Sequence, residues 1–584
     1  MKLIYNTNDK PKFGKLIVFA LQQVLAIITA TIVVPIITNN AAGLTGADAM
    51  SPAAALLGAG IGTLVYLLFT KFKSPVFLGS SFAFLGSMAA AFAGATTVAL
   101  GYAGLIMGAI LAGLVYVIIA LVVKFAGTGW LNKLMPAVVI GPTVAIIGLS
   151  LAGNAVGDLQ KSAYTNTKDN LNTLVQNYDE AVNNKAAVEL DIVNLEFKLT
   201  VLKAESLVKP SEDLTKEIKE VSDTLEAKQL ELVDQKDAET NEILVKGLNT
   251  LVAEAEAKLL ENYDSVEAAK EHAELLNKQA PINVIICVAC GIVTLLVTIV
   301  CSTFGKKMVK LIPFICGIGA GYGLGVVLTV IGTVAKVPVL QVIDFSPITS
   351  LFTNFSIESI VSIPSLTIVK AFGVFGQNIG GAKGFFSYLL AVAVAYVPVA
   401  FVVFAEHIAD HKNISSIIEK DLLTEPGLHR TLLGDGVGSM AGALVGGCPN
   451  TTYGESVACV AITKNASIAT IFTAAIMAII IAFFTPFVAF VNTIPSYVMG
   501  GVCMALYGFI AVSGLKMIQK VDLGLNKNLF VVSTILIAGI GGLALTFGKI
   551  TITPVACALI LGIIINLILN KAKETEEAEA PVEK

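Results

Sequence analysis

Charged residues are scarce in this chain, and their scarcity excludes an ordinary soluble protein. Only 14% of the 584 residues are charged, 55% are apolar, and the mean hydropathy is +0.79. Charged residues make up about a quarter of a typical soluble chain. The sequence also has no HExxH and no GxSxG motif, so nothing indicates a zinc or serine hydrolase. A membrane-embedded enzyme is therefore the function class that the sequence favours least.

Cysteine is missing from the one strongly charged part of the chain. All eight cysteines lie in apolar runs or beside them, and the stretch 158–278 has none, so we expect no disulfide framework. Cys287 and Cys290 form a CxxC pair without a matching second pair. We expect both to be small buried side chains rather than a metal or redox site.

Apolar runs of about 20 residues recur along the chain, which is typical of transmembrane helices. We therefore predict an all-α polytopic membrane protein with fourteen membrane segments. Their predicted ranges are 15–37, 52–70, 75–93, 98–123, 134–156, 281–303, 308–333, 386–409, 430–446, 451–464, 467–491, 494–514, 527–547 and 552–570. Lysine and arginine lie in alternate loops, and the intervening loop 38–51 has neither. The positive-inside rule then predicts a multi-pass plasma-membrane protein with both termini in the cytoplasm.

Segments three and ten are too short and too polar for full-length spans. The third, SPVFLGSSFAFLGS (74–87), is interrupted by glycine and serine, and the tenth, GGCPNTTYGESVA (446–458), by glycine, proline and asparagine. Extended backbone at membrane depth is tolerated only when it is buried or lines a cavity. The two segments occupy equivalent positions if the spans divide as seven plus seven. Such a matched pair indicates a transport site near the bilayer midplane.

The stretch 158–278 differs in kind from the rest of the chain. It holds 26 of the 43 acidic and 14 of the 39 basic residues, which gives a net charge of −12. Two apolar seams at helical spacing predict helices packed on each other, in the manner of a coiled coil. The seams are Ile192, Leu195, Leu199 and Leu202, and then Leu214, Ile218, Val221 and Leu225. Ser211 lies between them as a candidate N-cap. We predict a helical hairpin outside the membrane on the non-cytoplasmic side, or three helices if Gly247 breaks the second.

Ionisable side chains inside apolar segments are rare and usually functional. Segment eight carries Glu406, His407 and Asp410, and Glu455 starts the short helix of segment ten. Glu406 and Asp410 are four residues apart and share one helix face. Because a helix start offers free backbone N–H groups, we expect Glu406 and Glu455 to face one polar pocket from two helices. The alternative for Glu406 is an interfacial residue near a helix end. Asp435 is open between an interfacial residue and part of a proton path.

Seven pieces of the sequence resemble one family of transporters. They are LQQVLAIITATIVVPI (21–36), FLGSSFAF (77–84), AGTGWL (126–131), AEHIADH (405–411), PGLHR (426–430), CPNTTYGES (448–456) and MGGVCMALYG (499–508). Their order and spacing are similar to those of the nucleobase/ascorbate transporters (nucleobase–cation symporters), and most similar to the bacterial uracil-permease branch. The resemblance covers the chain apart from the charged insert.

The resemblance implies that a nucleobase, uracil in this branch, is imported together with protons and without a cofactor. The residues that match the family's substrate site are Ala30, Phe82, Glu406, Tyr453, Gly454, Glu455 and Tyr507. In the family, the two glutamates hydrogen-bond the base, and the aromatic ring at the Phe82 position suits a ring face. The candidate proton-coupling residues are Glu406, His407, Asp410 and Glu455. The expected partners are the base, the lipid bilayer and, as in many members of the family, a second copy of the chain, with no nucleic acid.

The family fold implies two inverted repeats of seven spans that form a core domain and a gate domain. The core is expected at 1–128 (spans 1–4) and 386–492 (spans 8–11). The gate is expected at 129–157, 279–335 and 493–572. The insert at 158–278, a connecting segment at 336–385 and an acidic cytoplasmic tail at 573–584 complete the chain.

Three departures from the family pattern keep alternatives open. Asp410 stands where the most similar proton-coupled permeases have histidine, and His411 is about 100° further around the helix. Ser456 and Ala458 stand where asparagine and glycine are usual, and the long insert is atypical. The alternatives are sodium coupling, with Asp410 as a hard oxygen ligand, and a purine base such as xanthine as substrate. A third alternative is a surface interaction protein that acts through the insert.

Overall fold

The computed structural model describes residues 3–127, 136–161, 163–236, 243–306, 308–353, 355–375, 381–547 and 550–569. They form two compact units, which we describe separately. The apolar unit comprises residues 1–160, 288–327 and 343–584, and the insert unit comprises 161–287 and 328–342. The acidic tail predicted at 573–584 and the end of the AGTGWL piece, 128–131, lie outside the described residues.

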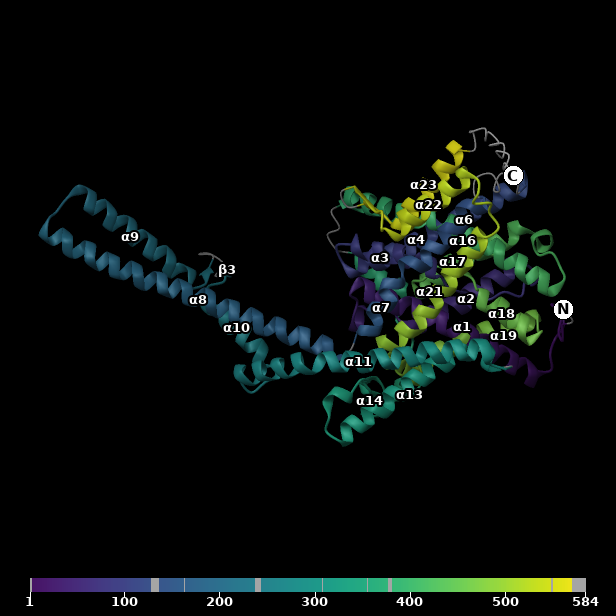
Figure 1. Ribbon diagram of the computed structural model, residues 1–584, viewed down its shortest axis with the longest axis horizontal. Helices are drawn as coiled ribbons and strands as arrows, with labels where there is room; N and C mark the ends of the chain where they lie inside the picture. The colour runs from purple at the N-terminus through teal and green to yellow at the C-terminus, as the bar shows by residue number, and fades with distance from the viewer. Residues whose placement is uncertain are drawn as a thin grey trace, which may run out of the picture. The chain divides into compact units, whose positions relative to one another are not determined.

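The apolar unit is built almost entirely of helices (Figure 1). Its helices are α1 (Phe13–Ala42), α2 (Pro52–Phe69), α3 (Leu85–Ala93), α4 (Val98–Ala126), α6 (Ala137–Ser150), α7 (Ala152–Gln160), α12 (Met308–Leu311), α14 (Ser346–Thr353), α15 (Thr367–Ala371), α16 (Gly381–Ile418), α17 (Leu428–Gly446), α18 (Gly454–Thr463), α19 (Ile468–Ala482), α20 (Thr485–Asn492), α21 (Ser496–Ile518), α22 (Asn526–Ile540) and α23 (Pro554–Leu569). Its strands are β1 (Leu78–Ser80), β4 (Asn450–Thr452), β5 (Leu545–Phe547) and β6 (Ile550–Ile552). Two further helices, α11 (Val266–Phe304) and α13 (Pro313–Val334), contribute residues to both units.

Eight helical segments of the described residues are long and apolar enough to cross a membrane. They are Phe13–Ala42, Gly46–Phe69, Val98–Ala126, Ala137–Gln160, Val266–Phe304, Pro313–Val334, Gly384–Ile418 and Ser496–Ile518. Five more of the predicted segments, including three and ten, contain shorter apolar helices, and predicted segment nine corresponds to α17. The prediction of a mostly helical protein of membrane type is therefore confirmed.

Two helices extend beyond the membrane segments predicted for them, and both continue past a polar stretch. Segment eight was predicted to end at 409, but α16 continues to Ile418. Glu406 therefore lies well inside a helix, which contradicts the alternative of an interfacial residue at a helix end. Segment six was predicted to start at 281, but α11 starts at Val266 and contains Pro281. A helix can continue from an apolar stretch into a charged one, because a change in side-chain polarity does not interrupt the backbone hydrogen bonds.

The extended stretches expected in segments three and ten pair with each other. Strands β1 and β4 run antiparallel, with Leu78 opposite Thr452, Gly79 opposite Thr451 and Ser80 opposite Asn450. Each strand leads into a short helical segment, Phe82–Phe84 followed by α3 on one side and α18 on the other. The pairing satisfies backbone groups that have no water to bind at membrane depth. It also brings two chain segments that are about 370 residues apart in sequence to one place.

A close helix crossing supports this strand pair. On α2 and α17, Gly62 and Gly438 approach so closely that a Cβ on Gly62 would lie 2.8 Å from the Gly438 carbonyl oxygen. Small residues permit such crossings of apolar helices. At the same crossing the Asn450 side chain donates to the Gly58 carbonyl oxygen at 2.9 Å. The crossing therefore anchors β4 to α2.

Two large clusters of buried apolar side chains lie among the described helices of the apolar unit. One contains residues of α1, α2, β1, α18 and α19, such as Ile27, Leu56 and Ile471. The other contains residues of α6, α22 and α23, such as Val139, Ile535 and Leu559. Hydrophobic burial is thus divided between two groups of helices within one unit.

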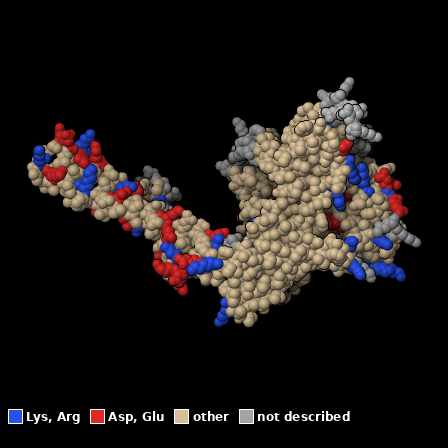
Figure 2. Space-filling view, in the orientation of Figure 1, with Lys and Arg blue, Asp and Glu red and all other residues tan. Residues whose placement is uncertain are grey.

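The insert unit contains the predicted hairpin. Helices α8 (Ala163–Val208) and α9 (Glu212–Glu231) lie side by side (Figure 1). Both predicted seams meet there, with Leu199, Leu202 and Val221 at their centre, and the Ser211 side chain accepts the predicted capping hydrogen bond from the Leu214 N–H at 3.2 Å. Figure 2 shows acidic and basic residues along the hairpin.

A third helix follows the hairpin, as the sequence allowed. The break between α9 and α10 (Leu248–Leu260) is longer than a single glycine, because strands β2 (Gln235–Lys236) and β3 (Ile243–Val245) precede Gly247. Leu259 of α10 packs against Leu171 of α8 and against the first turns of α11.

Candidate functional site

A pocket of about 450 Å³ lies inside the apolar unit. Three carboxylates line it, Glu406 and Asp410 from α16 and Glu455 from α18. The other lining residues come from two groups of elements, one around α1, β1, β4, α16 and α18 and the other around α6, α11, α12, α13 and α21. The first group contributes Ala26, Ser81, Phe82, Ala83, Ala409, Thr451, Thr452, Tyr453, Gly454, Ala458, Cys459 and Ile462, and the second contributes Val144, Ile147, Ser302, Lys310, Pro313, Phe314, Leu506, Phe509, Ile510, Ser513 and Met517. The volume lies within the usual range for small-molecule sites.

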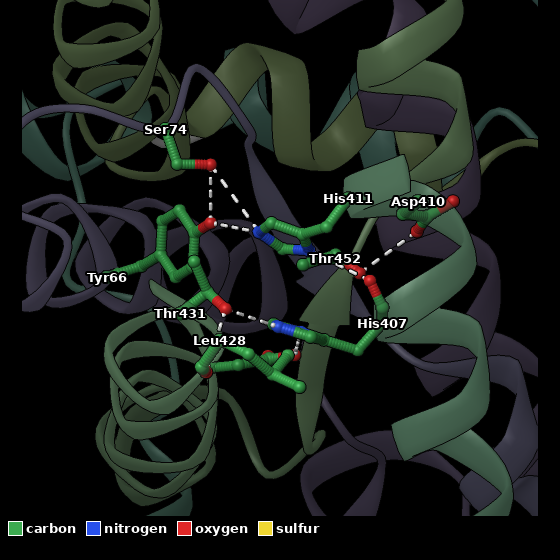
Figure 3. Close-up of polar contacts among 9 residues, drawn as sticks. Tyr66, Ser74, His407, Asp410, His411, Leu428, Thr431 and Thr452 are labelled. Atoms are coloured by element: carbon green, nitrogen blue, oxygen red, sulfur yellow. Dashed lines mark hydrogen bonds and ion pairs between the residues drawn. The ribbon is translucent and has the colours of Figure 1, made fainter. Parts of the chain in front are cut away.

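Helix geometry places Glu406 and Asp410 together. They are one turn apart on α16, so both side chains face the pocket, as the sequence predicted. The Thr452 hydroxyl donates to Asp410 Oδ2 at 2.9 Å (Figure 3). Because Thr452 belongs to β4, this hydrogen bond connects the side of α16 that carries Glu406 and Asp410 to the β1–β4 strand pair.

The strand pair places Glu455. This residue lies in the first turn of α18, directly after β4, where backbone N–H groups have no partner within the helix. Gly454 precedes it, and a Cβ on Gly454 would meet only Asp410 Oδ1, at 3.8 Å. A ligand can therefore approach the backbone at the start of α18 and reach Glu455, Glu406 and the helix N-terminus together.

The aromatic residues of the predicted site divide into two groups. Phe82 and Tyr453 line the pocket, and the Tyr453 hydroxyl donates to the Ser80 carbonyl oxygen at 2.6 Å. Tyr507 is buried behind Phe82, with the two ring centroids 6.2 Å apart in an edge-to-face arrangement. Ala30 is also buried. Neither Tyr507 nor Ala30 is among the lining residues of this pocket; Tyr507 packs against Phe82, which lines it, and Ala30 belongs to a cluster of buried apolar residues.

His407 and His411 of α16 do not line the pocket and belong to a buried polar cluster, whose contacts Figure 3 shows. His407 Nδ1 lies 2.6 Å from Asp435 Oδ2, and His407 Nε2 lies 3.0 Å from the Thr431 hydroxyl. His411 stacks on His407 with ring centroids 4.1 Å apart and contacts the Tyr66 hydroxyl at 2.7 Å. The Asp435 side chain is only 1% exposed, which excludes its interfacial alternative. The cluster is thus a packed hydrogen-bonded layer rather than part of the pocket wall.

We expect Asp435→Ala to destabilise the protein because it removes the partner of a fully buried imidazole. A buried polar group left without its hydrogen bond lowers the free energy of unfolding by about 1–3 kcal/mol. Thermal unfolding in detergent can be followed with a thiol-reactive dye, because six of the eight free cysteines are buried. Asp48→Ala, at an exposed acidic residue, is the matched control. Equal melting temperatures for the two variants would contradict the structural role of Asp435.

The sequence analysis did not name three polar residues that line the pocket. It also related Ser456 to the substrate site, whereas this residue does not line the pocket. Ser81 and Thr452 add hydroxyl groups to it, and Lys310 adds a positive charge. The polar residues that follow Pro449 could have indicated that Thr452 lies in the site. Lys310 lies between two predicted membrane segments, so in the sequence it resembles an ordinary loop lysine. Ser456, a departure from the family pattern, is buried away from the pocket and accepts a hydrogen bond from the Phe77 N–H at 3.1 Å.

Comparison with known proteins identifies the family. The sequence model of a permease family matches residues 14–183 and 266–547. The chain is 31% identical to a uracil permease of Bacillus subtilis (strain 168) over 98% of this chain and 97% of the relative, and 30% identical to a uracil permease of Bacillus caldolyticus over 99% and 97%. Among solved structures, the transmembrane domain of the cyanobacterium bicarbonate transporter BicA aligns with 96% of this chain and 100% of its own length, at 12% identity and a TM-score of 0.47. Because the family match covers more than half of the chain, this protein belongs to that permease family, the nucleobase/ascorbate transporters that its motifs resemble.

Proposed function

We propose that this protein imports uracil across the plasma membrane by proton symport. The observation that carries the proposal is the meeting of Glu406 and Glu455, from two helices distant in sequence, in one pocket of suitable size. The two relatives described above are uracil permeases and align over nearly the whole chain. The pocket and the sequence similarity are connected, because the AEHIADH and CPNTTYGES pieces that carry Glu406 and Glu455 are among the pieces that resemble the family.

The chemistry of uracil matches the groups that line the pocket. The base presents N–H donors beside carbonyl acceptors. Carboxylates accept hydrogen bonds from N–H groups, and a protonated carboxyl can donate to a carbonyl. The free N–H groups at the start of α18 supply further donors, and Phe82 offers an aromatic face beside the base. Glu406 and Glu455 would therefore hold the edge of the base, with Gly454 allowing its close approach.

The number of carboxyl groups in the pocket supports proton coupling. Three of them share one cavity, and like charges that lie close together disfavour simultaneous ionisation. Substrate binding and protonation of the group formed by Glu406, Asp410 and Glu455 would then be linked. His407, the fourth candidate coupling residue, does not line the pocket, and its side-chain partners are Asp435 and Thr431. Sodium coupling through Asp410 is the competing mode.

The arrangement of the pocket supports transport by alternating access. Its lining residues come from elements of the proposed core, α1, β4, α16 and α18, and from elements of the proposed gate, α6, α12, α13 and α21. The two buried clusters divide largely along the same line. Movement of the core against the gate would open the pocket to each side in turn. Fourteen spans in two inverted repeats, with both termini in the cytoplasm, are part of this proposal.

Uptake by the purified protein in liposomes tests the proposal. We expect radiolabelled uracil to accumulate when the outside is made acidic, and an inward sodium gradient alone to give no accumulation. Unlabelled uracil should compete, whereas xanthine should compete weakly. A chain that lacks 184–265, the internal stretch between the two parts of the family match, should transport at a similar rate. Accumulation driven by sodium alone would overturn proton symport, and preferred competition by xanthine would overturn uracil as substrate.

A further inference from the structure

Two of the eight cysteines differ from the others in exposure. Six are buried, whereas Cys301 of α11 and Cys316 of α13 are only partly buried. These two also contact each other, because a hydrogen bond joins their thiol groups. The two cysteines that a reagent can reach most easily are therefore the two that form a pair.

Helices α11 and α13 pack closely near the turn that connects them. A Cβ on Gly321 of α13 would overlap the hydroxyl oxygen of Thr294 on α11, and a Cβ on Gly317 would overlap the hydroxyl oxygen of Thr298. The two contacts follow each other in opposite directions along the two helices, so α11 and α13 run antiparallel here. Small residues permit this close approach of apolar helices.

The two cysteines continue the same row of contacts. Cys301 lies three residues after Thr298, on the same side of α11, and Cys316 directly precedes Gly317. A disulfide spans only about 4.4–6.8 Å between Cα atoms, so it requires helices that approach as closely as these do. The packing of α11 and α13 therefore permits a bond between the two sulfur atoms.

The chain between the two cysteines, residues 302–315, forms part of the pocket, and we call it the α12 turn. Four of its residues line the pocket: Ser302, Lys310, Pro313 and Phe314. Ile312 of the same turn packs against Ala26 of α1 and Cys459 of α18. The α12 turn thus belongs to the proposed gate and contacts the proposed core beside the pocket. Movement of the core against the gate would have to break this contact.

We propose that Cys301 and Cys316 are a dithiol switch, which a low-molecular-weight disulfide oxidises to an intramolecular disulfide that fixes the base of the α12 turn and slows transport. One cysteine thiolate attacks the small disulfide, forms a mixed disulfide and releases one small thiol. The other cysteine then attacks the protein sulfur of the mixed disulfide and releases the second small thiol. The two cysteines lose two protons and two electrons, and the small disulfide takes up both to become two thiols.

The position of the pair fits a reversible bond better than a permanent one. The predicted topology places the α12 turn, which carries Lys306 and Lys310, on the cytoplasmic side. Disulfides in the cytoplasm are rare and are usually transient and regulatory. Cys287 and Cys290 of α11 are also close in sequence, but both are buried, so an oxidant in water has no access to them.

Mass measurement on the full-length protein in liposomes tests the dithiol. The protein is treated with glutathione disulfide and denatured, its remaining thiols are blocked with N-ethylmaleimide, and its intact mass is measured. We expect the wild type to form an internal disulfide and to keep six of its eight thiols. Cys301→Ser and Cys316→Ser should not form this bond. Cys557→Ser, at a buried cysteine, is the matched control and should still form it.

Uptake of radiolabelled uracil by the same liposomes tests the effect on transport, and this measurement rests on the proposed function. We expect oxidation to lower wild-type uptake by about tenfold, because loop movements limit the rates of many proteins that open and close a site. Dithiothreitol should restore uptake. Cys301→Ser and Cys316→Ser should transport at the wild-type rate and keep that rate after oxidation.

Three results would overturn the proposal. An unchanged thiol count, or mixed disulfides with glutathione alone, would mean that the two sulfur atoms do not meet. An internal disulfide with unchanged uptake would mean that the base of the α12 turn does not have to move. Equal inhibition of Cys301→Ser and the wild type would place the oxidised group elsewhere. Absence of uracil uptake before oxidation would count against the proposed function alone, because the thiol count does not depend on substrate.

Discussion

Replacement of Glu455 or Glu406 by glutamine is expected to reduce uracil uptake by about 10- to 100-fold. Each substitution keeps the size of the side chain but removes a charged acceptor and a site that can carry the proton. A hydrogen bond to a charged group contributes about 1.5–3 kcal/mol, and each 1.4 kcal/mol corresponds to a tenfold change in affinity. The two residues bind one ligand in one pocket, so the effects of the two substitutions should not be additive.

The measurement is initial uptake of radiolabelled uracil by cells that lack their own permease, normalised to the amount of protein in the membrane. Glu425→Gln is the matched control, because that side chain is 73% exposed and pairs with Lys73 outside the pocket. We expect the control to transport normally. If either Glu406→Gln or Glu455→Gln transported like the control, the proposed binding role of that residue would be wrong.

Gly79→Ala is expected to lower uptake by a similar factor without replacing any residue that lines the pocket. A Cβ at this position would lie 2.4 Å from two atoms of the Tyr453 ring, far inside contact distance. The ring cannot simply swing away, because its hydroxyl donates to the Ser80 carbonyl oxygen and β1 is buried along its whole length. Tyr453 immediately precedes α18, so its displacement moves Gly454 and Glu455. A shift of about 1 Å in a binding group is enough for losses of roughly 100-fold.

Gly86→Ala is the matched control for this prediction. Gly86 lies in α3, shortly after β1, and an added Cβ there would meet no atom within 4 Å. We expect Gly86→Ala to transport normally and to melt at the wild-type temperature, whereas Gly79→Ala should also melt lower because overpacking costs about 1–3 kcal/mol. Normal uptake by Gly79→Ala would mean that the strand pair tolerates a shift of Tyr453 and does not position Glu455.

The local features of the site could be read from the sequence because each depends on residues close together in the chain. Glu406 and Asp410 face one direction since they are one helical turn apart. The glycine, proline and asparagine around 446–450 indicated extended backbone, and strand β4 is found there. The seams of the insert and the Ser211 cap are local in the same sense.

Where the sequence left the structure open, the missing information was non-local. The matches at Ala30 and Tyr507 came from family motifs, but whether a side chain reaches a pocket depends on the depth at which its helix packs. Asp435 could not be separated from an interfacial residue until its partner His407 was known. The ends of α11 and α16 were not evident from the membrane segments, because a helix can continue where the hydropathy changes but the backbone hydrogen bonding does not.

By itself the sequence determined that this is a helical membrane protein with a charged helical insert and a small set of acidic residues in apolar surroundings, because composition and periodicity act over one or two turns. Only the tertiary structure decided that β1 pairs with β4, that Glu406 and Glu455 share one pocket, and that the thiols of α11 and α13 lie in contact. The physical reason is that contacts between distant segments depend on how whole helices cross. Those crossings are set by close approaches such as that of Gly62 and Gly438, which no local pattern encodes.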